Sequence, residues 1–358
     1  MEIEKIYSEK AEEDIWSSLL KFTYTENLKR FFNDRQEDVN EDLIETISGS
    51  ISQAYEYFSV SKNASLQVSP LLLYYGATNL LYGVSCLLTG EVLKIENHGM
   101  KIEPSLKNQQ VAETTIRFSD SLHGGVSVYL KSLTDIDLSL PETSTWTVKE
   151  CLGSLVEIIP DFVTNYGNND LHVIPLKKFK AEKEEHFRII IGVNETEKLQ
   201  ELIKNIPDFC NNYLPPQLNN LNEIILRKKI NGNYLHQLSY TGQPFLSIGH
   251  KKKNNDVVLP YFLYLFIVLF SFGTLCRYHP EKWNPFVQND NTGEKNLIEK
   301  FIHISRRQLP NLMLNIIFKK EFLFNNDMYK DIDSRSPLNK EEIRKLIIEE
   351  LNNRRVWY

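Results

Sequence analysis

The feature that most constrains the fold is a nearly unbroken apolar segment from Val257 to Trp283, interrupted abruptly at Arg277-Tyr278-His279-Pro280. Such a segment either crosses a membrane or forms a central buried helix of a soluble core. Its densest part, Tyr261 to Cys276, would make roughly 24 Å of helix, which is shorter than the ~30 Å hydrocarbon layer of a bilayer. Long segments of globular composition flank it on both sides. We therefore expect a core helix and no transmembrane span.

Composition narrows the class of protein further. The chain has 358 residues, 42% of them hydrophobic and 25% charged, which suits two subdomains or one domain with an insertion. Its net charge of −6 means that the chain lacks the overall positive charge that is typical of nucleic-acid-binding proteins. Four cysteines lie far apart without a CxxC pair, and the acidic N-terminus has no apolar signal segment. These features favour a cytoplasmic protein.

Hydrophobic periodicity predicts a predominantly α-helical α+β fold with a central subdomain that contains a β-hairpin. We divide the chain into an N-terminal helical region (1–165), an α+β insertion (166–256) and a C-terminal helical region (257–358) that packs on the N-terminal helices. The hairpin is expected at Asn231-Gly232, because Glu223–Ile230 and Asn233–Tyr240 flank two residues that tolerate positive φ.

Capping and breaking residues suggest where individual helices begin and end. Ser69-Pro70 should open a helix over Leu71–Leu88, and Gly90 should end it. Pro160 should close a helix over Thr147–Ile159, and Pro310 should interrupt one that begins at Glu294. A last helix is expected over Asn339–Asn353, with Asn339 as its N-cap.

The sequence shows no readable catalytic constellation. The glycine-rich phosphate loops, HExxH, GxSxG and paired zinc-ligand spacings are all missing. Arg117 and His123 have the Arg-x(4–6)-His spacing of HEPN-type ribonucleases, in which Arg stabilises a phosphodiester transition state and His is the acid or base. About one such match is expected by chance, and the segment resembles a strand and a turn rather than a helix. We therefore expect no catalytic residue, no metal and no cofactor.

Several polar and aromatic residues remain as candidates for binding. Arg and His at a helix end can simply stabilise the last carbonyl groups; alternatively, they converge with aromatic rings to hold an anionic or planar ligand. Tyrosines on Leu71–Leu88 can likewise be core residues. The binding candidates are Arg277, Tyr278, His279, Trp283, Tyr75, Asn79 and His98. Lys251, Lys252 and Lys253 are solvated strand-end residues or a basic contact for lipid headgroups or nucleic acid.

Four segments together resemble the YaaC-like protein family of bacteria. They are Asp14–Phe22 with Leu28–Phe32, Ser69–Gly76 with Asn79–Leu81, Asn97–Met100 with Ile116–Phe118 and Gly124-Gly125, and Phe272–Pro280 with Trp283. The family has no established enzymatic activity, so the resemblance transfers no catalytic residue. It implies a cytoplasmic bacterial protein, and some YaaC-like members serve in antiphage defence. In systems that act on nucleus-forming jumbo phages, a YaaC-like subunit recognises early infection and recruits a second protein.

On this basis we expect a non-enzymatic recognition or scaffold subunit that senses infection and recruits an effector protein. The trigger would be derived from the phage, as a lipid or a protein surface, and nucleic acid is not the expected ligand. Two other interpretations stay open, namely a HEPN-like ribonuclease that uses Arg117 and His123 and a housekeeping binding module. The sequence leaves self-association open.

Overall fold

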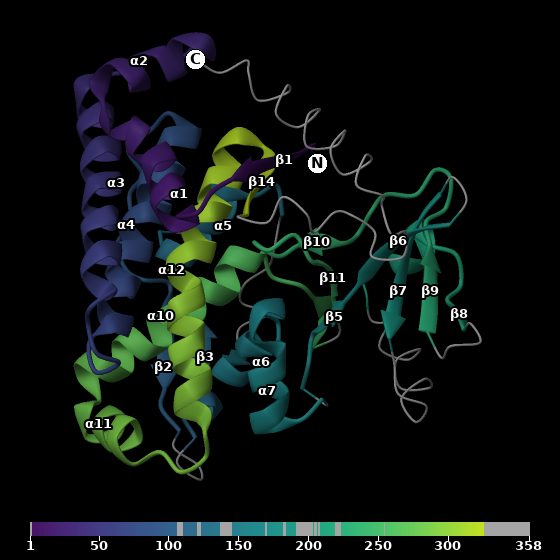
Figure 1. Cartoon of the computed structure of the whole chain (residues 1–358). Coiled ribbons are helices and arrows are strands. Elements are labelled where there is room, and N and C mark those ends of the chain that lie inside the picture. Colours follow the sequence, from purple (N-terminus) through teal and green to yellow (C-terminus); the bar gives the residue numbers. More distant parts are fainter. Residues whose placement is uncertain are drawn as a thin grey trace.

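The protein is a predominantly helical α+β molecule (Figure 1). The computed structural model describes residues 2–105, 110–119, 123–136, 145–168, 170–181, 184–190, 203, 206, 208–218, 223–253 and 255–325. Its α-helices are α1 (Ala11–Leu19), α2 (Thr25–Asp34), α3 (Glu41–Ser61), α4 (Ser69–Thr89), α5 (Gly125–Leu133), α6 (Val148–Leu152), α7 (Ile159–Tyr166), α9 (Phe209–Asn212), α10 (Tyr261–Tyr278), α11 (Pro280–Asn289) and α12 (Glu294–Phe318). Short 3-10 turns are η1 (Leu20–Thr23), η3 (Val111–Glu113) and η4 (Val156–Ile158).

The helical body is built around α10, as the apolar segment predicts. Every residue from Tyr261 to Gly273 is buried, because this helix has no polar face and must be covered on all sides. It packs against α4, and α4 in turn packs along α3 (Figure 1). The long helix α12 contacts α1, α4 and α10, so the C-terminal helices close the core that the N-terminal helices begin.

In the part of the chain that the structure describes, two helices are long and apolar enough to cross a membrane by length and composition. They are α4, with a mean hydropathy of 1.4 over its best window, and α10, with 1.5. Most of each window is buried inside the molecule, 61% in α4 and 78% in α10. Both are therefore packed as core helices of this fold, which agrees with the interpretation of Val257–Trp283 as a core helix.

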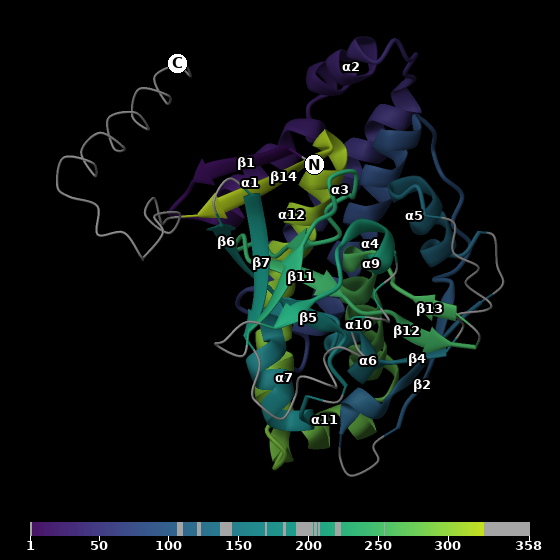
Figure 2. The same cartoon turned by 90° about the vertical axis from the view of Figure 1, so that its right-hand side faces the viewer.

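The strands form small sheets at the edges of this body. Their bounds are β1 (Glu2–Tyr7), β2 (Met100–Glu103), β3 (Thr115–Phe118), β4 (Thr145–Thr147), β5 (Val173–Pro175), β6 (Lys177–Ala181), β7 (Glu184–Ile190), β8 (Gln217–Leu218), β9 (Glu223–Arg227), β10 (Gln237–Leu238), β11 (Pro244–Ser247), β12 (His250–Lys252), β13 (Asn255–Val257) and β14 (Lys320–Asn325). The sheet orders are β2-β3-β4, β6-β7-β9-β8, β10-β11-β5, β12-β13 and β1-β14. Seen from the side, β1 and β14 lie at the opposite end of the molecule from β2 and β4 (Figure 2).

The central strands have a small core of their own. Phe187, Tyr213, Leu226 and Leu246 belong to this second apolar cluster, separate from the large cluster of the helical body. Within it, β6 and β7 pair as antiparallel neighbours, with Lys177 opposite Arg188. The central region thus contains a β-hairpin, as expected, although not the one that the Asn-Gly signal indicated.

The prediction of a hairpin at Asn231-Gly232 is wrong. Strand β9 pairs with β7 and β8, whereas β10 pairs with β11, so the two flanking strands do not pair with each other. A turn does occur there, with the Gly232 amide donating to the Lys229 carbonyl at 3.0 Å. Glycine is required for a different reason, because a Cβ on Gly232 would lie 2.3 Å from the Asn212 carbonyl oxygen.

Two proline predictions are also corrected. Pro160 does not close a helix; it lies in the first turn of α7, where its missing N–H costs nothing. Pro310 lies inside α12, which continues unbroken to Phe318.

The predicted helix Leu71–Leu88 is confirmed and ends at Gly90, whose φ is 72°. The helix predicted over Asn339–Asn353 falls outside the described residues.

Candidate functional site

The end of α10 brings three of the predicted binding residues together. The apolar helix stops at His279, whose φ of −132° leaves the helical region, and Pro280 immediately starts α11. This abrupt end leaves Arg277 and Tyr278 at the surface. On the neighbouring helix α4, Tyr75 lies within reach of Arg277. We call Tyr75, Arg277 and Tyr278 the arginine–tyrosine cluster.

A glycine sets the spacing between the two helices that form this cluster. A Cβ on Gly273 of α10 would lie 3.0 Å from the Cβ and 3.3 Å from the Cγ of Tyr74 on α4. Any larger residue would push α10 away from α4. The close approach of the two backbones therefore places the side chains of the next turn, including Arg277, against the tyrosines of α4.

Arg277 is held by aromatic groups rather than by an acid. Its Nη1 donates a hydrogen bond to the hydroxyl of Tyr75. Its guanidinium carbon lies 4.9 Å from the ring centre of Tyr278 and 5.9 Å from that of Tyr75. No carboxylate of the described residues forms an ion pair with it. A planar cation held between rings, with no acid beside it, is suited to receive an anionic group.

His98 is an exposed residue that contacts Tyr74 of α4 and Phe270 of α10. Its Nδ1 is 2.6 Å from the hydroxyl of Tyr74, and its ring centre is 5.8 Å from that of Phe270. Burial, and after it the charge of Arg277, lowers the pKa of His98. Burial raises the pKa of Tyr74, so this hydroxyl keeps its proton. The Tyr74 hydroxyl and the neutral His98 imidazole therefore share this hydrogen bond.

The other predicted binding residues have different surroundings. Trp283 is only 1% exposed; its Nε1 donates to the Leu66 carbonyl at 3.3 Å, which makes it a core residue that anchors α11. The Nδ1 of His279 is 3.5 Å from a carboxylate oxygen of Glu281 in the first turn of α11. Asn79 is half-buried on α4, one turn beyond Tyr75.

The Lys251–Lys253 segment forms strand β12 and the turn after it, and it does not present three equivalent cations. Lys251 and Lys253 are exposed. Lys252 is bound by the protein itself: its Nζ lies 2.7 Å from Glu150 Oε1, 2.9 Å from the Thr145 carbonyl and 4.2 Å from the ring centre of Trp146. Only Lys251 and Lys253 are thus free to contact another molecule.

The residues of the ribonuclease hypothesis have separate partners. Arg117 lies in strand β3, as its sequence indicates, and its guanidinium forms an exposed ion pair of 3.1 Å with Glu103 on β2. The backbone carbonyl of His123 accepts a hydrogen bond from the Glu96 amide, in the turn before α5. Neither residue lies on a helix, the element that carries this motif in HEPN-type enzymes.

No sequence pattern indicated that the side chains of His172 and His250 would lie together. The rings of His172 and His250 stack with centres 3.6 Å apart, and Nε2 of His250 lies 2.8 Å from the hydroxyl of Ser154. Glu150 Oε1 is 4.0 Å from the other nitrogen of His250, so the group superficially resembles a serine hydrolase triad. Ser154 is only 2% exposed, however, and a nucleophile must reach its substrate. We assign this group a structural role.

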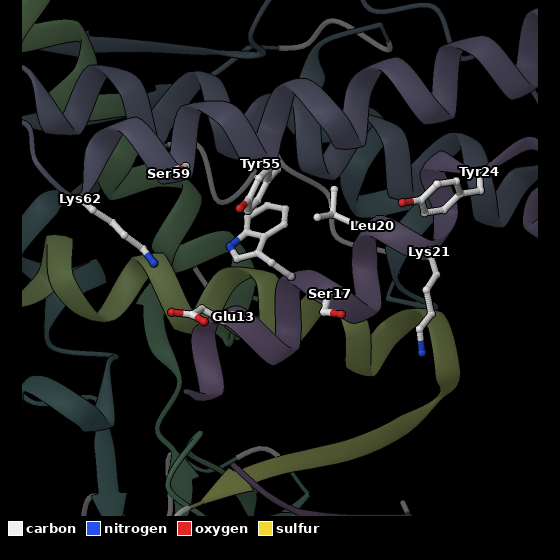
Figure 3. A pocket seen from close by; sticks show the side chains of 9 residues that line it. Glu13, Ser17, Leu20, Lys21, Tyr24, Tyr55, Ser59 and Lys62 are labelled. Carbon is white, nitrogen blue, oxygen red and sulfur yellow. The ribbon is translucent and has the colours of Figure 1, made fainter. Parts of the chain in front are cut away.

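A groove that the sequence did not predict lies between α1 and α3 (Figure 3). Tyr55 lies in its middle, and Lys62 and Tyr24 lie toward its two ends (Figure 3); Trp16, whose ring contacts that of Tyr55, also lines it. A periodic stripe of hydrophobic residues could have suggested that α1 and α3 pack together, but not that they leave a hollow.

Among the described residues, no group of three or more His, Cys, Asp or Glu side chains is arranged to hold a metal ion.

Fold and site together define a helical α+β protein with an exposed arginine–tyrosine cluster at the end of its core helix. The family of this protein follows from comparison with known proteins. The chain belongs to the YaaC-like protein family, whose model matches residues 10–317. No curated protein and no solved structure matches the chain.

Proposed function

We propose that this protein is a non-enzymatic recognition subunit of a bacterial antiphage defence system, acting in the cytoplasm. In this role it senses a feature of infection and recruits a second protein as effector. Membership of the YaaC-like family supports the proposal, since some members of that family serve in antiphage defence. The arginine–tyrosine cluster is the surface that we assign to partner binding.

The unpaired cation of Arg277 is the observation that carries this assignment. Tyr and Arg are enriched at the centres of protein interfaces, where they contribute most of the binding energy. Tyr278 has 61% of its surface exposed, which is unusual for a large ring and leaves apolar area for a partner to cover. The buried helix α10 holds both residues on a rigid base, so little conformational entropy is lost on binding.

The chemistry of the cluster also indicates what a partner must provide. A guanidinium presents a planar fork of donors that matches a carboxylate. Because Tyr75 already occupies Nη1, the remaining N–H groups of Arg277 are left for a partner. We therefore expect an acidic side chain of the effector protein at this position, with Tyr278 packing beside it.

A plaque assay on cells that carry the complete defence locus tests the role directly. Arg277→Gln with Tyr278→Ala should abolish protection, while the protein remains folded and expressed because both side chains are exposed. The matched control is Arg117→Gln, another exposed arginine, which should leave protection intact.

Loss of protection in Arg117→Gln and His123→Ala, with Arg277→Gln still protecting, would overturn the proposal in favour of a ribonuclease. Plaque counts unaffected by deletion of the gene would favour a housekeeping binding module.

A further inference from the structure

The groove between α1 and α3 has the size and lining of a small-molecule site. Its volume is about 470 Å³, within the range of ~300–1,000 Å³ that is typical of ligand pockets. Its lining extends from Lys62 at the end of α3, past Tyr55, to Tyr24 before α2. Figure 3 shows Ser17 and Lys21 on one side and Tyr55 on the other. A groove of this volume suits one compact ligand rather than a polymer strand.

Several uncharged polar groups that line the groove have no hydrogen-bond partner among the described residues. These groups are the indole N–H of Trp16 and the hydroxyls of Ser17, Tyr55 and Ser59. Hydroxyl side chains on helices of this protein usually donate to a carbonyl one turn back, as Ser18 does to Asp14 at 3.0 Å. The groups at the groove all have hydrogen-bonding capacity left, so a ligand rich in acceptors fits them.

Aromatic rings give the groove a rigid middle and an adaptable end. The ring of Trp16 is fixed by Tyr55 at 5.4 Å and by Phe58 at 5.1 Å, and only 3% of Trp16 is exposed. Tyr24, in contrast, has 64% of its surface exposed and makes no aromatic contact among the described residues. A free tyrosine ring at the mouth of a groove can stack on a planar ligand.

Charge at the groove favours an anion. Lys10 pairs with Glu13 at 3.2 Å, and Lys62 pairs with Glu12 at 3.3 Å, so the acids nearest the groove are matched. Lys21 has no carboxylate partner among the described residues and leaves one uncompensated positive charge. A lysine ammonium is a common partner of phosphate oxygens.

From these observations we infer that the groove binds a planar ring that carries a phosphate, the chemical class of the nucleoside monophosphates. In this arrangement the ring stacks on Tyr24 and the phosphate pairs with Lys21, both of which line the groove. This site is independent of the arginine–tyrosine cluster and contains none of its residues.

Isothermal titration calorimetry of the full chain with AMP, GMP, CMP and UMP tests the inference. At least one nucleotide should bind, and its nucleoside or inorganic phosphate alone should bind at least about tenfold more weakly, because each supplies only half of the contacts. Tyr24→Ala should weaken binding about tenfold through loss of stacking. Lys21→Met should weaken it about fivefold or more through loss of the charged hydrogen bond.

Matched variants separate this site from other exposed residues of the same kind. Tyr278→Ala removes an equally exposed tyrosine at the arginine–tyrosine cluster, and Lys29→Met removes an exposed lysine of α2 that pairs with Glu26. Both should leave nucleotide affinity unchanged. The inference is overturned if no nucleotide binds at millimolar concentration, or if binding survives both Tyr24→Ala and Lys21→Met at full strength.

Discussion

Arg277 on α10 donates a hydrogen bond to the hydroxyl of Tyr75 on α4, 202 positions earlier in the chain. Arg277 lies at the exposed C-terminal end of α10, whereas Tyr75 is a half-buried residue in the first half of α4. The hydrogen bond fixes one edge of the guanidinium and leaves the other edge toward solvent. Recognition at this position therefore depends on a preorganised arginine and not only on positive charge.

This geometry predicts that lysine cannot replace Arg277. Arg277→Lys keeps the charge but loses the planar fork and the stacking on Tyr278, whose ring centre is 4.9 Å from the guanidinium. We expect protection against phage to fall about tenfold or more in a plaque assay, because interface anchors of this kind contribute about 2 kcal/mol. Protection at the wild-type level in Arg277→Lys would mean that charge alone suffices.

The close approach of α10 and α4 predicts that Gly273 cannot carry a side chain. Gly273→Ala would bring a methyl group 3.0 Å from the Cβ of Tyr74, and we expect it to lower the free energy of unfolding by about 1–3 kcal/mol in urea denaturation. Gly49→Ala on α3 is the matched control, because nothing lies within 4 Å of its added Cβ. That variant should raise stability by about 0.5–1 kcal/mol. Equal effects in the two variants would contradict the packing argument.

The buried carboxylate of Glu294 predicts a large cost on truncation. It accepts hydrogen bonds from the amides of Val111 and Ala112, both at 2.8 Å, and from the hydroxyl of Tyr166. Glu294→Ala would leave these donors buried and unpaired, so the free energy of unfolding should fall by about 3 kcal/mol or more. Glu299→Ala, on the exposed face of the same helix, should change it by less than about 0.5 kcal/mol. A small effect at Glu294 would show that water replaces the carboxylate.

The stacked histidine pair predicts a loss of stability in mild acid. Burial lowers the pKa of His172 from 6.5 to about 4 and that of His250 well below its usual value. Between pH 6.5 and 4 the unfolded chain therefore binds protons that the folded chain does not. Stability contributed by neutral His172 is present above pH 6.5 and falls with decreasing pH, by about 1.4 kcal/mol per pH unit at most.

His172→Phe isolates this effect, because it keeps a stacked ring and removes the titration. Buried carboxyls such as Glu157 and Glu294 have raised pKa values, so their protonation stabilises the folded state as pH falls, opposite to the effect of His172. The pH dependence of the wild-type stability therefore contains contributions from several groups. The difference in unfolding free energy between wild type and variant should change steadily from pH 6.5 to 4.5. Parallel curves for the two proteins would contradict a neutral buried His172.

The sequence predicted the parts of the fold that depend on local patterning. Helix α10 follows from its continuous apolar composition, and α4 follows from Pro70 at its start and Gly90 at its end. Pro310 was misread because its effect depends on tertiary packing. Burial of Leu309, Met313 and Leu314 on either side of it holds α12 together despite one missing backbone hydrogen bond.

Contacts between distant segments could not be predicted. Strand β1 pairs in parallel with β14, with Glu2 opposite Lys320, and neither short strand carries a local signal for the other. The same limit applies to the site. Arg277, Tyr278 and Tyr75 were candidates because of their residue types, but only the packing of α10 on α4 showed that they meet. The groove at Trp16 depends on how two helices diverge, which no periodic pattern specifies.

An affinity purification of the tagged protein from phage-infected and uninfected cells tests whether the arginine–tyrosine cluster recruits a partner protein. Arg277→Gln is the comparison. Co-purifying proteins, lipids and nucleic acid would be identified in each sample. We expect a protein partner that co-purifies only from infected cells. It should be retained by the wild type and by Arg117→Gln but lost from Arg277→Gln. Recovery of RNA with cleaved ends and no protein partner, or a partner bound equally well by Arg277→Gln, would contradict it.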